Sequence, residues 1–367
     1  MRIAQIAPLY ERVPPLLYGG TERVVSYLTD ELVRQGHEVT LFASGDSITK
    51  ARLVPCSERS LRLDKSVVDP LAHHFVMLEK VFTRAEEFDV VHFHIDYLHY
   101  PFSQRRKNLS HVSTLHGLLD LPDLKPLYEL FNQVPVVSIS DAQRRPLPWA
   151  NWLGTVHHGL PPDLYRARNE PGNYLVFLGR VSLEKRLDRA IEIAKRTGMP
   201  LKVAAKIDNA DRKYFEKSIR PLLDDAVVEW IGEVDESGKQ ELLANAYALL
   251  FPIDWPEPFG LVLIEAMACG TPSIAYRCGS VPELVEEGVT GFIVDNLAAA
   301  VEAVGKVASV DRAACRRRFE ERFSVGRMAE GYLKIYEQIL HSRSRSSLLS
   351  VAATNGRSSG SLVSFSK

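Results

Sequence analysis

Residues 256–272, PEPFGLVLIEAMACGTP, contain the features that decide the fold. The Pro-Phe-Gly step breaks the chain directly before a good helical sequence, so this stretch predicts a loop that leads into a helix N-terminus. Unpaired backbone N–H groups and the helix dipole both favour an anion at such a terminus. One carboxylate, Glu257, lies in the Pro-bounded loop, and a second, Glu265, lies within the apolar run that follows. The stretch therefore predicts an anion site with two carboxylates beside it.

Short β-rich runs alternate with helical patterns on both sides of this stretch. In the first half the runs include RIAQIAP, HEVTLFAS and DVVHFHI, and in the second half YLVFLGR, LKVAAKI and ALLFPI. The clearest helical pattern covers residues 21–37, where apolar residues recur at helical spacing and Gly36 marks the end. Strands that alternate with helices predict parallel sheets covered on both faces. The expected fold class is α/β, with two doubly wound Rossmann-like domains that face each other across a cleft.

Composition divides the chain into four segments. A linker rich in Pro and Gly at residues 159–174, GLPPDLYRARNEPGNY, separates two halves of similar size. We expect a first domain at residues 1–165, a second domain at 166–323 and a C-terminal helix at 324–341. The remaining residues, 342–367, are rich in serine and lack periodicity, which predicts a disordered tail.

Charge and cysteine usage exclude several classes of function. Lys and Arg total 45 against 46 Asp and Glu, so a dedicated nucleic-acid binder, which carries a basic excess, is disfavoured. The four cysteines show no C-x-x-C spacing, which favours free thiols in a reducing compartment. The N-terminus reads as a strand without a signal peptide, and no apolar run is long enough to span a bilayer. We expect a cytoplasmic protein, and a small basic cluster at residues 105–107 suggests peripheral membrane association at most.

Two further motifs suit an anionic ligand. In YGGTER, Gly19 and Gly20 precede a helix, where the backbone can approach a ligand closely; an ordinary flexible loop is the alternative. In GRVSLEK, Arg180 and Lys185 flank a turn at a strand end and suit a diphosphate; a solvated charge cluster is the alternative. The dinucleotide fingerprint G-x-G-x-x-G does not occur at the glycine pair, which disfavours a nicotinamide oxidoreductase.

Histidines and closely spaced acidic residues are the side chains in this sequence that could bind a metal ion. The run VVHFHIDYLHY contains His92, His94 and His99, but no framework of Cys or carboxylate residues completes a site. The chain also contains no D-x-D, the acidic pair that would chelate a divalent metal on a nucleotide diphosphate. We therefore expect no protein-bound metal. His116, in TLHGL at a strand end, is a candidate to bond a sugar hydroxyl, with a structural loop histidine as the alternative.

Taken together, these residues resemble family 4 of the retaining glycosyltransferases, which have the GT-B fold. The resemblance extends from the first strand to about residue 340. It rests on the E-x7-E element from Glu257 to Glu265, on G-R-x-x-x-E-K at 179–185, on PELVEEGVTGFIV at 282–294, and on the glycine pair before the first long helix. The stretch WPEPFGLV is similar to sequences in the branch of the family that contains an avilamycin-pathway enzyme.

The resemblance implies a role for each candidate residue. Arg180 and Lys185 would bind the donor diphosphate and stabilise the leaving group. The remaining roles concern the sugars, the nucleotide and the backbone contacts. Glu257 would contact the donor sugar, and His116 would lie near the transferred sugar. Glu265 would accept hydrogen bonds from the ribose. The residues that would approach the donor through their backbone are Gly19, Gly20, Phe259, Gly260 and Leu261. Lys206, where the family often has a Gly-rich turn, adds a third cation towards the cleft, with a solvent-facing side chain as the alternative.

The resemblance also implies an activity. The chain would transfer a hexose from a UDP- or GDP-hexose to a sugar, lipid-linked or small-molecule acceptor, with retention of anomeric configuration. The nucleotide sugar would be a co-substrate, and no cofactor would be needed. The last helix would cross back onto the first domain. Two alternatives of the same fold stay open at this point: a non-catalytic nucleotide-sugar-binding protein and a sugar-nucleotide epimerase, which would need additional acid/base carboxylates in the cleft.

Overall fold

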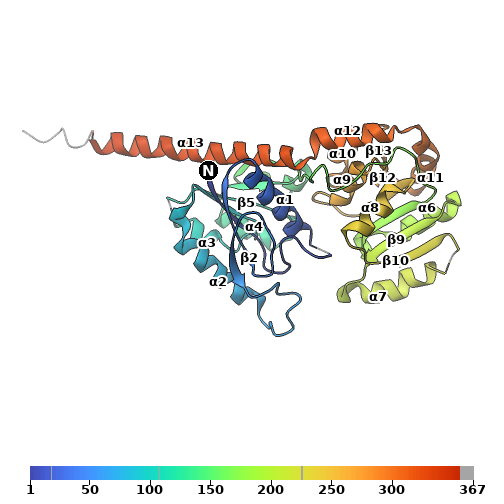
Figure 1. Cartoon of the computed structure of the whole chain (residues 1–367), viewed down its shortest axis with the longest axis horizontal. Coiled ribbons are helices and arrows are strands. Elements are labelled where there is room, and N and C mark those ends of the chain that lie inside the picture. Colours follow the sequence, from blue (N-terminus) through green and yellow to red (C-terminus); the bar gives the residue numbers. More distant parts are fainter. Residues whose placement is uncertain (18, 107, 225, 356–367) are drawn as a thin grey trace, which may run out of the picture.

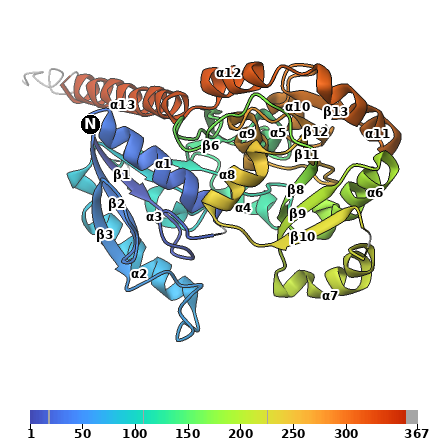
Figure 2. The same ribbon diagram turned by 45° about the vertical axis from the view of Figure 1, so that its right-hand side comes forward.

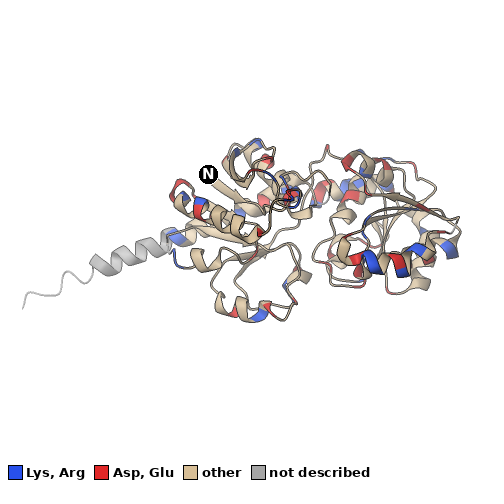
Figure 3. Cartoon of the chain, turned by 90° about the horizontal axis from the view of Figure 1, so that it is seen from below, with Lys and Arg blue, Asp and Glu red and all other residues tan. Residues whose placement is uncertain are grey.

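The computed structural model describes residues 1–17, 19–106, 108–224 and 226–355. Two α/β domains lie side by side, and one long helix runs from the second domain along the first (Figures 1 and 2). Lys107, part of the small basic cluster, and residues 356–367 of the expected tail lie outside the described residues. In the view of Figure 3, basic and acidic residues are interspersed over both domains, in keeping with the near-zero net charge.

The first domain is built on a parallel sheet of seven strands in the order β3-β2-β1-β4-β5-β6-β7. The strands are β1 (Arg2–Ile6), β2 (Glu38–Ser44), β3 (Arg52–Ser57), β4 (Val90–Phe93), β5 (His111–Thr114), β6 (Val136–Ser138) and β7 (Trp152–Thr155). The helices are α1 (Gly20–Arg34), α2 (Pro70–Thr83), α3 (Tyr100–Ser103), α4 (Leu124–Leu130) and α5 (Asp141–Arg144), with a short 3-10 turn at Ala85–Glu87. Helix α1 buries Val24, Leu28 and Leu32 against the sheet, as its apolar spacing predicts.

The second domain has a parallel sheet of six strands in the order β10-β9-β8-β11-β12-β13. The strands are β8 (Leu175–Arg180), β9 (Leu201–Lys206), β10 (Val228–Gly232), β11 (Ala248–Phe251), β12 (Ser273–Tyr276) and β13 (Gly291–Val294). The α-helices are α6 (Leu187–Thr197), α7 (Arg212–Tyr214), α8 (Glu236–Ala244), α9 (Leu261–Ala268), α10 (Val281–Leu284), α11 (Leu297–Lys306) and α12 (Arg312–Arg322). Short 3-10 or π turns cover Leu183–Lys185, Asn209–Asp211, Phe215–Ile219, Arg220–Leu222 and Val307–Ser309. The expected fold class, two doubly wound Rossmann-like domains, is confirmed.

The chain passes between the domains twice, and the two passages lie together. The first sheet ends at Thr155 and the second begins at Leu175. Within that linker, Leu160 N–H donates to the Phe323 carbonyl at 2.9 Å, and its carbonyl accepts from Val325 N–H at 2.8 Å. These bonds hold the segment that leads into the second domain beside the segment that leads out of it.

The last helix, α13 (Val325–Asn355), packs on the first domain. Its Met328, Tyr332 and Tyr336 are buried in the same core as Val24 of α1 and Val112 of β5. The helix continues through residues 342–355, where the serine-rich composition led us to expect disorder; extending an existing helix is much easier than starting one. No helix within the described part of the chain is both long and apolar enough to cross a bilayer.

Candidate active site

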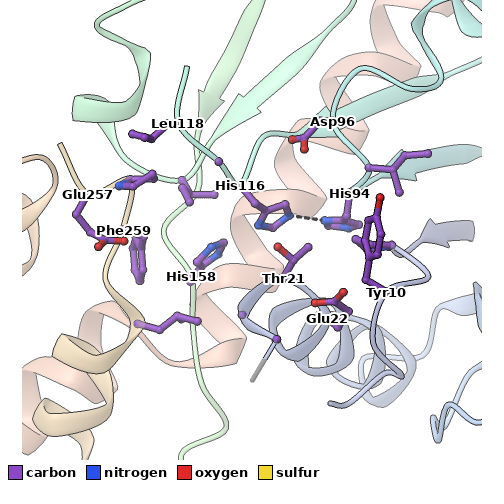
Figure 4. A pocket seen from close by; sticks show the side chains of 18 of the residues that line it. Tyr10, Thr21, Glu22, His94, Asp96, His116, Leu118, His158, Glu257 and Phe259 are labelled. Carbon is purple, nitrogen blue, oxygen red and sulfur yellow. Dashed lines mark hydrogen bonds between the residues drawn. The ribbon is translucent and has the colours of Figure 1, made fainter. Parts of the chain in front are cut away.

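A cavity of roughly 770 Å³ lies between the two domains. Its first-domain wall is formed by loops that follow β1, β4 and β5 and by the start of α1, and its second-domain wall by the end of β8 and the loop between β11 and α9. Figure 4 shows side chains from both walls pointing into it. The cavity is lined by nine of the predicted site residues: Gly19, Gly20, His116, Arg180, Lys185, Glu257, Phe259, Gly260 and Leu261. Parallel strands bring them together because their carboxyl ends meet at one edge of each sheet.

Lys185 and Glu257 form the centre of the second-domain wall. The Lys185 ammonium is in direct contact with the Glu257 carboxylate, which also accepts a hydrogen bond of 3.0 Å from the Trp255 indole N–H. The same ammonium lies 4.8 Å from the centre of the Trp255 ring. The cation is thus held at the cavity by one carboxylate and by the faces of two aromatic rings, Trp255 and Phe251.

Arg180 lies at the end of β8, beside this pair. Its guanidinium donates to Glu184 at 2.6 Å and lies 3.7 Å from Asp208 and 3.8 Å from Asp211. About one third of the side chain is exposed, so the three carboxylates hold it loosely at the cavity surface. Arg180 and Lys185 together give this wall two cations that can exchange carboxylate partners for another anion.

Gly260 shapes the helix terminus that the sequence predicts. It adopts a left-handed backbone with φ of 85° directly before α9, and a Cβ there would lie 3.2 Å from the Phe251 ring. Gly260 and Leu261 both line the cavity, so the N-terminus of α9, with its unpaired N–H groups, lies at the cavity wall. On the opposite side Gly20 begins α1, where a Cβ would lie 3.5 Å from Leu261. Both domains therefore bring backbone close to the same place.

A smaller cavity of roughly 180 Å³ adjoins the main one, and it contains the other two predicted residues. Gly19, Gly20 and Leu261 line both cavities, whereas Lys206 and Glu265 line only the smaller one. Lys206 pairs with Asp208 at 3.1 Å. Lys206 therefore lies beside Arg180, its register partner on the neighbouring strand, and the two cations share Asp208, although only Arg180 lines the main cavity.

Glu265 is held by a lysine that the sequence analysis missed. The Lys239 ammonium donates to the buried Glu265 carboxylate at 2.7 Å and also lies 3.0 Å from Glu236. Glu236 in turn contacts Arg23 of the first domain and the Tyr165 hydroxyl. Lys239 lies on α8, in a sequence without any local motif, so only the three-dimensional contact identifies it.

The first-domain wall includes three neutral imidazoles, those of His94, His116 and His158. His116 Nε2 lies 2.9 Å from His94 Nδ1, as the dashed line in Figure 4 shows, and the His116 ring stacks on His158 with 5.3 Å between ring centres. Burial lowers the pKa of His116 to about 3 and holds those of His94 and His158 well below the usual value. His158 also packs against Phe259 of the second domain. Neither His94 nor His158 was predicted as a site residue.

Two carboxyl groups on the same wall were also missed. Glu22, in the first turn of α1, is buried, and desolvation raises its pKa to about 7. Asp96 has a left-handed backbone with φ of 50°, and its side chain is exposed at the cavity. Both line the main cavity (Figure 4). A raised pKa marks a carboxyl that can exchange a proton near neutral pH.

The histidines considered for a metal divide between different surroundings. His92 is buried and bonds to Tyr336 and Thr114, His94 reaches His116, and His99 bonds to Ser103 and Ser113. Among the described residues, no group of three or more His, Cys, Asp or Glu is arranged to bind a metal ion. The four cysteines are free thiols.

Comparison with known proteins identifies the class. The family model described as glycosyl transferases group 1 matches residues 166–322, and the model described as glycosyltransferase family 4 matches residues 18–154. Together they span both domains. The chain is therefore a two-domain glycosyltransferase with the GT-B fold.

Three similar proteins agree with this class. An uncharacterized glycosyltransferase of Methanocaldococcus jannaschii is 24% identical over 80% of this chain and 84% of its own length. The crystal structure of AviGT4, a glycosyltransferase involved in avilamycin A biosynthesis, is 25% identical with a TM-score of 0.72 and covers 93% of this chain and 98% of its own. Anabaena HepE, in complex with UDP-glucose, has the same fold, with 18% identity, a TM-score of 0.67 and coverage of 94% and 100%. The chain belongs to the family 4 type of glycosyltransferases.

Proposed function

We propose that this glycosyltransferase moves a hexose from a UDP- or GDP-hexose to a hydroxyl group of its acceptor, with retention of anomeric configuration. The observation that carries the proposal is the convergence of Arg180, Lys185 and the N-terminus of α9 on one interdomain cavity. A diphosphate is the anion that suits two cations and a row of backbone N–H groups. Anabaena HepE, whose structure holds UDP-glucose, supports a donor of this class.

Departure of the diphosphate is the step that the second-domain wall assists. As the bond from the anomeric carbon to the phosphate oxygen breaks, negative charge grows on that oxygen, and Arg180 and Lys185 stabilise it. Lys185 is paired with Glu257 before the donor enters. We infer that the diphosphate replaces this carboxylate on the ammonium. Glu257, still held by Trp255, is then available to accept a hydrogen bond from a sugar hydroxyl.

Retention follows if the acceptor hydroxyl attacks the face that the phosphate leaves. The new bond from the anomeric carbon to the acceptor oxygen forms on that face, and the departing phosphate oxygen takes the acceptor's proton. This route needs no protein base at the reacting carbon. A covalent intermediate through Glu257 is disfavoured because that carboxylate is held by the Trp255 indole and is assigned here to a hydroxyl of the donor sugar.

The smaller cavity suits the nucleoside end of the donor. Glu265 is a buried carboxylate that accepts a hydrogen bond from Lys239, and its remaining lone pairs can accept hydrogen bonds from the two ribose hydroxyls. We further propose that no metal ion is required, because cations and N–H groups supply the charge stabilisation that a divalent ion gives elsewhere.

A donor screen followed by product analysis tests the proposal. The purified protein is incubated with UDP- and GDP-hexoses and a panel of sugar acceptors, in EDTA and in Mg²⁺, and the products are read by NMR. We expect transfer with one donor, an anomeric configuration equal to that of the donor, and equal rates in EDTA and Mg²⁺. Inversion would exclude same-face attack, and activity that EDTA abolishes and Mg²⁺ restores would exclude the metal-free mechanism.

One observation favours a second activity, epimerisation of a nucleotide sugar. Glu22 and Asp96 both line the cleft and would supply the acid/base carboxyls that an epimerase needs. Incubation of the donor alone in D₂O separates the two activities. A transferase leaves the sugar carbons unlabelled, whereas an epimerase introduces deuterium at the carbon that it inverts.

A further inference from the structure

A continuous chain of hydrogen bonds joins the crossover helix α13 to His116 at the cavity. The Gln5 amide, on β1, donates from Nε2 to the Tyr336 hydroxyl at 3.1 Å. Its carbonyl oxygen lies 2.8 Å from His94 Nε2, and His94 Nδ1 lies 2.9 Å from His116 Nε2. Gln5 and His94 are buried, so water does not compete for these bonds.

The chain has a fixed direction because the Gln5 carbonyl oxygen can only accept. His94 Nε2 must therefore carry a proton, and since burial keeps His94 neutral, its Nδ1 carries none. A bare His94 Nδ1 accepts only if His116 Nε2 donates. His116, which is also neutral, is then left with a lone pair on Nδ1.

The other end of the chain agrees with this direction. The Tyr336 hydroxyl accepts from Gln5, so its own proton is free for His92 Nδ1 at 2.7 Å. His92 Nε2 then donates to Thr114 Oγ1 at 2.7 Å, and that hydroxyl donates to Tyr332 at 3.0 Å. Each hydrogen bond in this chain then has one donor proton and one acceptor. The reverse direction would require the side-chain amide of Gln5 to rotate by half a turn, so that its oxygen and nitrogen exchange places.

His116 Nδ1 is the end of this chain, and this buried atom has no hydrogen-bond partner among the described residues. An unpaired buried polar atom is costly, which makes it a place where a ligand group gains a bond. The imidazole lines the main cavity, beside His158 (Figure 4). A lone pair on Nδ1 suits a hydroxyl that donates.

We propose that Gln5 and His94 are positioning residues that fix His116 as its Nε2–H tautomer, so that Nδ1 accepts a hydrogen bond from a hydroxyl of the transferred sugar. The identity of the ligand rests on the proposed function, whereas the tautomer does not. The arrangement makes His116 selective: it binds a sugar that carries a hydroxyl at this position and loses that bond with the corresponding deoxy sugar.

The tautomer is measured directly by ¹⁵N NMR of the histidine rings in the free protein, with His116→Gln to assign the signals. We expect a proton on His116 Nε2 and an unprotonated Nδ1 throughout pH 6 to 8. A proton on Nδ1 with a bare Nε2 would overturn the proposal. Because this readout needs no turnover or ligand, it stands or fails separately from the transferase assignment.

Variants at Gln5 and His94 test the positioning role. Gln5→Leu removes the acceptor that orients His94, and we expect His116 to populate both tautomers. Gln5→Glu keeps an acceptor towards His94, so we expect the wild-type tautomer. His94→Asn places a carbonyl oxygen near the site of the lost Nδ1 and should retain the tautomer that His94→Leu loses. A single Nε2–H tautomer in both Leu variants would overturn the proposal, and the two conservative variants remain informative if either Leu variant fails to fold.

Binding of UDP-glucose and of UDP gives the second readout. We expect Gln5→Leu to weaken UDP-glucose binding by about two- to tenfold, the value of one neutral hydrogen bond, and to leave UDP binding unchanged. The matched control is His99→Asn. His99 is as deeply buried in the same domain, but its partners are Ser103 and Ser113, away from the chain. An equal loss for UDP and UDP-glucose in Gln5→Leu, or the same sugar-specific loss in His99→Asn, would contradict the role.

Discussion

The two walls of the cleft differ in the kind of polar group that they present. The second-domain wall carries paired charges, with Lys185 on Glu257 and Arg180 among three carboxylates. The first-domain wall carries neutral imidazoles, with His116 bonded to His94 and stacked on His158. Charges that can exchange partners suit an anion that enters and leaves. Neutral rings with fixed protons suit the recognition of hydroxyl groups, which requires direction more than charge.

The largest expected effect is on the charged wall. We predict that Lys185→Ala lowers kcat by about 10²- to 10³-fold, because the leaving diphosphate loses a preorganised cation. The matched control is Lys195→Ala, on the exposed face of α6 and away from both cavities. Transfer rates and melting midpoints are measured for both variants. Wild-type turnover in Lys185→Ala would remove the leaving-group role.

A second prediction concerns Glu22 on the other wall and uses stability as its readout. Burial raises the pKa of its carboxyl from 4.5 to about 7 in the folded state. Between these values the folded state binds the extra proton, so the carboxyl costs stability as pH rises through this window. The cost is fully present above pH 7 and absent below pH 4.5, and it amounts to about 3 kcal/mol.

Glu22→Gln should therefore stabilise the protein at pH 8 and have little effect at pH 4.5. Denaturant unfolding at the two pH values measures the difference. Glu38→Gln, at the exposed start of β2, is the control and should change stability by the same small amount at both. A Glu22→Gln effect independent of pH would show that the carboxyl is not desolvated.

The residues that line the smaller cavity should contribute to the affinity for the nucleotide. We predict that Glu265→Gln weakens binding of the nucleoside diphosphate by about thirtyfold, since charge-assisted bonds to the ribose are lost, with a smaller change in kcat. Lys239 retains Glu236 as a partner in this variant, so the fold should persist. Calorimetric titration gives the dissociation constant. A change confined to kcat would indicate that Glu265 acts at the reacting centre and not in donor binding.

The smallest predicted effect belongs to His116. Replacement by alanine removes one neutral hydrogen bond, and we expect kcat/KM to fall by about tenfold. Because the pKa of His116 is about 3, the ring stays neutral, and the loss should be the same at pH 5.5 and pH 8. A loss that appears only at the higher pH would indicate an imidazole that titrates near its usual value.

The sequence predicts much of this arrangement because its signals are local. Alternating strands and helices predict two parallel sheets, and residues just after parallel strands must meet at one edge, which brings Arg180, Lys185 and Glu257 together. Strand β3 gives only a weak sequence signal, because ARLVPCS is short, contains proline and is only partly buried at the sheet edge.

What the sequence does not reveal is pairing between distant segments. Lys239 becomes a site residue only through its contact with Glu265, and Gln5 only through Tyr336, which is 331 positions away along the chain. Glu22 was visible in the YGGTER motif, but its raised pKa comes from burial by the assembled domain. The helix at residues 342–355 arises because α13 is already formed on the first domain.

A thermal-shift experiment tests whether the charged wall binds the diphosphate. Melting midpoints of the wild type and of Lys185→Ala are measured with uridine, UMP and UDP, and with the guanosine series, because a ligand that binds only the folded state raises the midpoint. We predict that one series shifts the wild type most at the diphosphate and that Lys185→Ala loses this increment while keeping the shift from the nucleoside. Equal shifts with diphosphate in the two proteins would contradict the account.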